Sequence, residues 1–113
     1  MPHLIIEFSQ DQAHEEQVEA MLDAVHRAAL GSGLFDESHI RVRAIPISFY
    51  RTAGNRAHFI HAQCRIHDGR TTAQRRALSE AVLVSLKAQG WPATVITVEV
   101  VELDRASYVK SLD

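Results

Sequence analysis

Hydrophobic positions recur along this chain with two different periods, and the change from one period to the other predicts its first two elements. Residues 2–8 form an apolar run of strand length that begins on Pro2. Positions on one face of a helix come next: Val18, Met21, Leu22, Val25 and Ala29. Residues 9–12 have the Ser-x-x-Gln form of a capping box, so we expect the helix to begin there and to end at Gly31 and Gly33.

The remainder of the chain repeats this order. Residues 39–47 and 57–66 alternate as strands do, and residues 93–101 are rich in Val, Ile and Thr. A second helix lies between the last two strands, capped by Thr71 or Thr72, ended by Gly90, and with core spacing at Leu78, Ala81, Val82 and Leu86. Pro46 predicts a sheet edge or a bulge, and residues 51–56 predict a hairpin turn. Residues 104–113 form a tail with room for one helical turn.

Two strand-helix-strand units predict an α+β fold of the (β-α-β)2 type, with a four-stranded mixed sheet and both helices on one face. The other face then lacks a cover within the chain. The side chains expected on that face are Arg41, Arg43, Phe59, His61, Gln63 and Arg65, together with apolar groups. A partly apolar bare face of this size predicts a homo-oligomer that assembles through it.

Composition narrows the class of protein. The chain has 113 residues, 46% hydrophobic and 23% charged, which suits one domain over residues 1–113. A net charge of −2 argues against nucleic-acid binding, and the apolar runs are too short for a membrane span. The first apolar run has no basic flank before it and no small-residue cleavage site after it, so a signal peptide is not expected. The single cysteine, Cys64, sits mid-strand as a small buried hydrophobe and fits a reducing cytoplasm.

Candidate chemistry centres on Pro2. A small residue at position 2 normally permits removal of the initiator methionine, which would leave Pro2 as a secondary amine at the edge of a sheet. An α-amino group has a pKa of about 7.7–8.0, and burial and nearby cations lower it toward the value that suits a general base. Arg41 and Arg43 lie on the strand that returns parallel to the first, and Arg70 opens the second helix, where an anion is favoured. Each arginine taken alone is better explained as a surface residue, but together they would bind an acidic substrate.

Other chemistry receives less support from the sequence. His58 and His61 alternate to opposite strand faces and make a poor metal pair, so no metal is expected. His3 and His61 are candidates for neighbours of Pro2, although a packed or hydrogen-bonded histidine is the commoner state. The sequence contains no glycine-rich phosphate loop, zinc-ligand spacing or Ser-His-Asp order.

Several of these residues together resemble a known family. Residues 2–7, residues 33–35 followed by 40–43, and residues 59–61 leading to Gly69-Arg70 are similar to 5-carboxymethyl-2-hydroxymuconate isomerases of the tautomerase superfamily. The resemblance runs from Pro2 to about the end of the second helix. It implies an amino-terminal proline as general base in 1,3-proton shifts, and a trimer. It also implies a cofactor-independent reaction in bacterial aromatic catabolism, the degradation of homoprotocatechuate.

The resemblance also assigns residues. Pro2 would be the catalytic base, Arg41 and Arg70 match substrate-binding arginines, and Arg43 matches a further arginine at the site. The substrate would be 5-carboxymethyl-2-hydroxymuconate or a similar small dienol carboxylate. Two alternatives remain open: a tautomerase acting on another enol acid such as phenylenolpyruvate, and a non-catalytic ligand-binding or regulatory module in which Pro2 is only the first strand residue.

Overall fold

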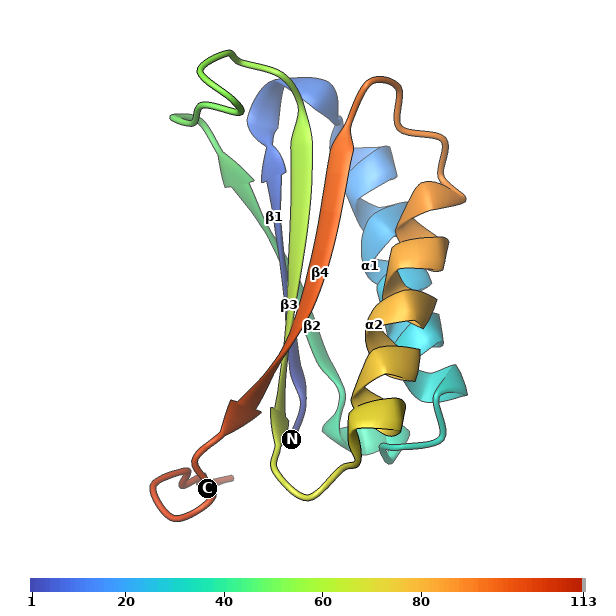
Figure 1. Cartoon of the computed structure of the whole chain (residues 1–113), viewed down its shortest axis with the longest axis vertical. Coiled ribbons are helices and arrows are strands. Elements are labelled where there is room, and N and C mark those ends of the chain that lie inside the picture. The colour runs from blue at the N-terminus through green and yellow to red at the C-terminus, as the bar shows by residue number, and fades with distance from the viewer. Residues whose placement is uncertain (113) are drawn as a thin grey trace.

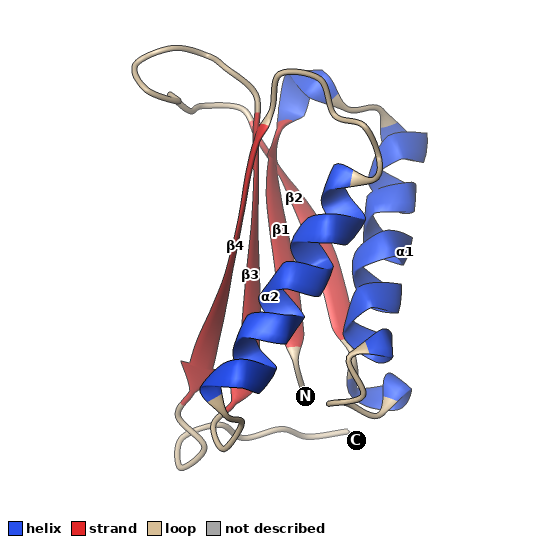
Figure 2. Ribbon diagram, turned by 45° about the vertical axis from the view of Figure 1, so that its right-hand side comes forward, coloured by secondary structure: helices blue, strands red, loops and turns tan. Residues whose placement is uncertain are grey.

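A four-stranded sheet with two helices packed on one face forms the body of the protein (Figures 1 and 2). The structure, a computed structural model, describes residues 1–112. The strands are β1 (His3–Ser9), β2 (Arg41–Ile47), β3 (Phe59–His67) and β4 (Val95–Leu103). The helices are α1 (Glu15–Gly31) and α2 (Thr72–Lys87), with short 3-10 turns at Gln10–Gln12 and Glu37–His39.

The sheet has the order β2-β1-β3-β4 and is mixed. β1 pairs with β2 in parallel, β3 pairs with β4 in parallel, and the two halves join through the antiparallel pair β1 and β3. The predicted α+β fold with two βαβ units is therefore confirmed. Pro46 lies on β2, which is an edge strand, as its missing N–H requires.

The core lies between the sheet and the helices, where burial of apolar surface stabilises both layers. Alternate residues of β1 and β3 point into it, and one face of each helix closes it. Its fully buried members include Leu4, Ile6, Ile60, Cys64, Ile66, Met21, Val25, Leu78, Val82 and Leu86. The helical and strand spacings in the sequence predicted these positions, but three other predicted core positions, Val18, Leu22 and Ala81, are only partly buried.

The predicted start of the first helix is wrong. Ser9 ends β1 and makes no capping bond, because its hydroxyl turns inward, where it donates to Gln12 Oε1 (2.9 Å) and accepts from the Phe59 N–H (3.2 Å). α1 instead begins after His14, whose backbone N–H donates to Gln17 Oε1 (3.1 Å) and whose carbonyl oxygen accepts from the Gln17 N–H (3.0 Å). Thr71 caps α2, as the sequence predicted: its hydroxyl oxygen accepts from the Gln74 N–H (3.1 Å), and the Thr71 N–H donates to Gln74 Oε1 (2.9 Å).

The predicted hairpin between the second and third strands is also wrong. β2 and β3 are not neighbours, because β1 lies between them in the sheet. Residues 48–58 therefore pass over the end of β1, and their compact part is a local turn with Thr52 bridged to Asn55. A local turn pattern gives no information about which strands pair. Here the apolar β1 pairs with both β2 and β3 and separates them.

The second face of the sheet carries no helix within the described residues 1–112 (Figure 2). His61 lies on this face, with its two ring nitrogens 2.7 Å from Thr97 Oγ1 and 2.6 Å from Glu99 Oε2. Ile45 and Val95 are 40% and 49% exposed there, so the face is partly apolar, as the sequence predicted. In the same range, no helix is long and apolar enough to cross a membrane.

Candidate functional site

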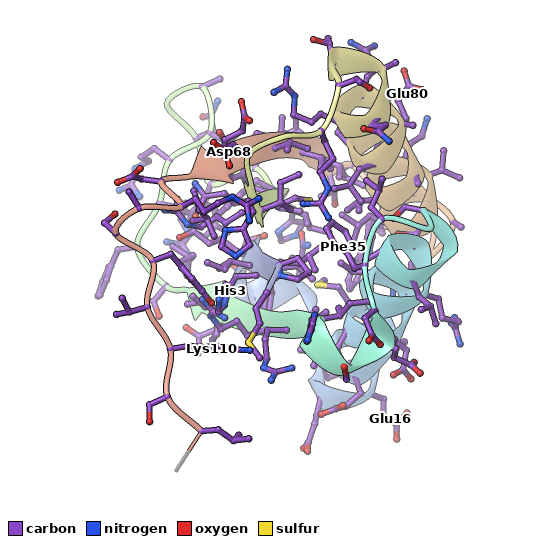
Figure 3. All side chains as sticks on the ribbon, turned by 90° about the horizontal axis from the view of Figure 1, so that it is seen from below. His3, Glu16, Phe35, Asp68, Glu80 and Lys110 are labelled. Carbon is purple, nitrogen blue, oxygen red and sulfur yellow. The ribbon has the colours of Figure 1, made fainter. Side chains whose placement is uncertain are left out.

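One end of the sheet holds an open pocket of about 480 Å³. β1 and β2 begin at this end and β3 and β4 finish there, since His3 pairs with Arg65 and His67 pairs with Leu103. Figure 3 views the molecule from this end, with His3, Phe35 and Asp68 around the opening. The residues that line the pocket are Met1, Pro2, Leu34, Phe35, Asp36, His39, His67, Asp68, Gly69, Arg70 and Arg105.

Pro2 is buried and lines the pocket, one residue before β1 begins. Its carbonyl accepts a hydrogen bond from the Arg41 N–H (3.0 Å), which extends the pairing of β1 with β2 by one residue. The terminal amine next to it, that of Met1, has a pKa below its ordinary value. Burial is the largest cause, and the positive charges of Lys110, Arg70, Arg41 and Arg105 act in the same direction.

Arg70 lies in the turn between β3 and α2 and reaches into the same pocket. Gly69 precedes it with φ +108°, a conformation that favours glycine and makes the tight turn possible. The Arg70 guanidinium lies over the Phe35 ring (5.2 Å to its centroid) and donates to the Leu34 carbonyl oxygen (2.8 Å). Both partners are uncharged, so Arg70 is held in place without neutralisation of its positive charge.

Arg41 and Arg43 flank the pocket without lining it. The Arg41 guanidinium donates to the carbonyl oxygens of Ser38 (2.9 Å) and Ile40 (3.3 Å), and Arg43 Nη1 lies 3.2 Å from His3 Nδ1. Both side chains are exposed. The structure thus brings Pro2 and Arg70 together in one pocket, and it places the two arginines of β2 beside that pocket, on the uncovered side of the sheet.

Of the two histidines proposed as neighbours of Pro2, only His3 lies at this end. His61 pairs with Glu7, four residues further along β1, and bonds with residues of β4. His3 has a lowered pKa, caused first by burial and then by the nearby Arg43 charge. His3 therefore stays neutral to lower pH than an ordinary histidine.

Sequence reasoning missed His67, Asp68 and Arg105 as site residues. It placed Arg105 in a tail and gave the other two no role. The expected parallel pairing of β3 with β4 could have found them. Two parallel strands that pair end at the same edge of the sheet, so the residues at and after their ends lie close together. His67 has a lowered pKa from burial, with the amino terminus, Arg105 and Arg70 adding to it against a weaker effect of Asp68.

This arrangement has the features of an anion-binding pocket beside an amino terminus. The guanidinium groups of Arg70 and Arg105 come from two separate segments and line it, and the Met1 amine beside them has a lowered pKa. Among residues 1–112 there is no group of three or more His, Cys, Asp or Glu side chains that could hold a metal ion. The chemistry that these residues can perform by themselves is carboxylate binding and proton transfer.

The two βαβ units joined through antiparallel central strands, with a site at the start of β1, define the tautomerase fold. An isomerase of this kind from Deinococcus radiodurans R1, 5-carboxymethyl-2-hydroxymuconate isomerase, superposes with a TM-score of 0.85 at 21% identity, covering 99% of this chain and 90% of that one. A malonate semialdehyde decarboxylase inhibited by 3-bromopropiolate gives a TM-score of 0.77 at 17% identity, covering 96% and 88%. A fused 4-OT symmetric trimer gives 0.78 at 18% identity, covering 92% and 87%.

A family model gives the more specific assignment. The model described as 5-carboxymethyl-2-hydroxymuconate isomerase matches residues 2–110, and the chain belongs to that family. No sequence among curated proteins matches the chain significantly. The resemblance seen in the sequence is thereby confirmed, and family and fold together identify the protein as an isomerase of the tautomerase type.

Proposed function

We propose that this protein, after removal of Met1, isomerises 5-carboxymethyl-2-hydroxymuconate or a closely similar dienol carboxylate in bacterial aromatic catabolism. Pro2 would be the general base, and no cofactor would be needed. One observation carries the proposal: Pro2 and Arg70 line a single pocket, and burial and nearby cations lower the pKa of the Met1 amine, one residue before Pro2. After removal of Met1 the same surroundings would lower the pKa of the Pro2 amine, so the pocket would supply a neutral base and a site for a carboxylate.

In the proposed reaction the Pro2 nitrogen takes the proton of the 2-hydroxyl group. The O–H electron pair forms the C2–O double bond, the C2–C3 double bond moves to C3–C4, and the electrons of C4–C5 take a proton back from Pro2 at C5. Every atom of the substrate is retained, so the product is an isomer. A base whose pKa lies near neutral pH is best suited to both transfers.

Arg70 would bind a carboxylate of the substrate and stabilise the negative charge of the dienolate. Its guanidinium retains its full charge because its structural partners are the Leu34 carbonyl and the Phe35 ring. Pre-placed cations of this kind usually make the largest contribution to catalysis of such steps. Arg41, which lies beside the pocket with its backbone N–H bonded to the Pro2 carbonyl, would bind a carboxylate that extends out of the pocket, and Arg43 would act at the site through His3.

A trimer assembled through the uncovered sheet face is part of the proposal. One structural neighbour is a fused 4-OT symmetric trimer. The exposed apolar side chains of β2 and β4, Ile45 and Val95, support burial of this face against other copies. Light scattering during size-exclusion chromatography would give the mass in solution, and a monomer at micromolar concentration would contradict the trimer.

An ultraviolet assay of dienol ketonisation tests the catalytic role of Pro2. The enzyme is first checked by mass spectrometry for loss of Met1. Pro2→Ala leaves a primary amine in place, so the rate should fall while the circular dichroism spectrum is unchanged. Blocking the amine by acetylation should reduce the rate by about 10²–10⁴-fold, the usual contribution of a general base. Full activity of the acetylated protein would refute the proposal.

The same assay separates the alternatives. Faster ketonisation of phenylenolpyruvate than of a 2-hydroxymuconate-type dienol would indicate a tautomerase for a different enol acid. Binding of these acids without turnover of either, in protein with a free Pro2 amine, would indicate a ligand-binding module.

A further inference from the structure

The pocket contains an ion pair that the proposed proton transfer does not use. Arg105 Nε lies 3.0 Å from Asp68 Oδ1, and Arg105 Nη2 donates to the Asp68 backbone carbonyl oxygen (2.8 Å). Both residues line the pocket, and their side chains are 60% and 59% exposed. Arg105 is therefore a second guanidinium in the pocket, on the side formed by the chain after β4.

The C-terminal segment is fastened so that Arg105 stays at the pocket. After β4 the chain makes one turn, in which the Tyr108 N–H donates to the Asp104 carbonyl (3.1 Å). The Tyr108 hydroxyl lies 2.9 Å from His3 Nε2, and its ring packs edge-on against His67 at 4.9 Å. In Figure 3 this segment runs past His3 and Lys110 along one side of the opening, with Phe35 on the other. Residues of β1 and β3 thus hold the turn that carries Arg105.

The two guanidinium groups have different partners. Arg70 is held by a carbonyl and an aromatic ring, so an incoming carboxylate has no competitor there. Arg105 is held by a carboxylate, which occupies the position that a ligand carboxylate would take. An exposed ion pair is weak, because solvent screens it and both side chains lose freedom, so a ligand can replace Asp68 with little loss. The bond from Arg105 to the Asp68 carbonyl would remain during that exchange.

We propose that Arg105 is a second carboxylate-binding residue of this pocket and that Asp68 is its resident counterion, which the ligand's carboxylate displaces. Arg70 and Arg105 together then select acids with two carboxylates over acids with one. As a statement about substrate selection the inference rests on the proposed function, whereas as a statement about binding it stands on the pocket alone.

Binding of two unreactive acids of equal length tests it. Adipate and hexanoate are titrated into the ¹⁵N-labelled full chain, and dissociation constants are taken from the amide shifts. We expect adipate to bind more tightly, and Arg105→Gln to weaken adipate by about tenfold, as expected for loss of a charge-assisted bond, with hexanoate changed less than about twofold. Arg105→Lys, which keeps the charge, should recover part of the loss.

Arg76→Gln is the matched control. Arg76 is an exposed arginine with one carboxylate partner, Glu80 at 2.7 Å, on the outer side of α2. It reports the effect of removing one positive charge from the surface. If Arg105→Gln weakens adipate no more than Arg76→Gln, or weakens both acids equally, the proposal is overturned.

Asp68→Asn tests the displacement step. This variant removes the competing carboxylate and leaves the backbone carbonyl that holds Arg105. Adipate should bind about two- to fivefold more tightly, in line with the small energy of an exposed pair. Weaker adipate binding would show that Asp68 is not displaced, and would overturn that step. Neither acid reacts, so the binding results do not depend on whether the protein turns over a dienol. Equal binding of the two acids by a protein with normal turnover would refute the role of Arg105 and leave the proposed function standing.

Discussion

Arg43 Nη1 lies 3.2 Å from Nδ1 of His3, and this contact determines which nitrogen of the imidazole carries the proton. A guanidinium can only donate, so Nδ1 of a neutral His3 accepts and the proton is on Nε2. Nε2 then donates to the Tyr108 hydroxyl oxygen at 2.9 Å. β2, β1 and the C-terminal segment are thereby linked by one chain of hydrogen bonds beside the pocket.

Replacing Arg43 by methionine should raise the pKa of His3. Burial contributes most to lowering this pKa and the Arg43 charge comes second, so the variant removes the second cause and leaves the first. The measurement is an NMR titration of the His3 ring protons. Arg51→Met, which removes an exposed arginine bonded only to the Tyr50 carbonyl among the described residues, is the control. An unchanged His3 pKa in Arg43→Met would contradict the charge relationship.

Replacing Arg70 by methionine should raise the pKa of the amino terminus. Arg70 is one of the cations that lower the pKa of the Met1 amine, after burial and Lys110, and after removal of Met1 we expect the Pro2 amine, which lines the same pocket as Arg70, to respond in the same direction. A general base works in its neutral form, so activity rises with pH through the pKa of the amine, and a higher pKa moves that rise to higher pH. The pH dependence of kcat/KM for the processed enzyme measures this shift, alongside a general loss of rate. If the rise of kcat/KM on the acidic side stays at the same pH in the variant, the Arg70 charge does not lower the pKa of the amine.

Ser9→Ala should destabilise the fold although it removes one oxygen atom. Ser9 is fully buried, and its hydroxyl accepts from the Phe59 N–H while donating to Gln12. The variant leaves a buried N–H without its partner, a loss of about 1–3 kcal/mol in the free energy of unfolding. Urea denaturation measures it. Ser38→Ala, at an exposed serine whose recorded bonds use backbone atoms, should change stability by less than about 0.5 kcal/mol.

Cys64 should resist alkylation while the protein is folded. Its side chain is fully buried between the sheet and the helices, and burial raises the pKa of its thiol to about 12. The thiolate is the reactive form, so both its rarity and its inaccessibility slow the reaction. Iodoacetamide at pH 8, followed by mass spectrometry, should modify the protein rapidly in urea and slowly without it. Equal rates in the two conditions would contradict a buried thiol.

The elements that were predictable are those whose signal is local. The alternation of Ile60, Ala62, Cys64 and Ile66 identified β3 and its buried face, and the spacing of Leu78, Val82 and Leu86 identified the inner side of α2. These patterns reflect which side of an element meets the core, and that is encoded by neighbouring residues. The failures were the cap at Ser9 and the hairpin before β3, where a distant partner, Phe59 or β1, overrides the local preference.

The sequence by itself determined the periodicity of each strand and helix and the two βαβ units. It also determined the family of the chain, through motifs that include Pro2 and Arg70. Only the tertiary structure brought the C-terminal segment to the same pocket: Tyr108 contacts His3 across 105 positions of sequence, and Arg105 meets Asp68 across 37. The physical reason is that proximity depends on strand order and register. These are set by how the whole apolar surface is buried, and no local spacing of residues encodes them.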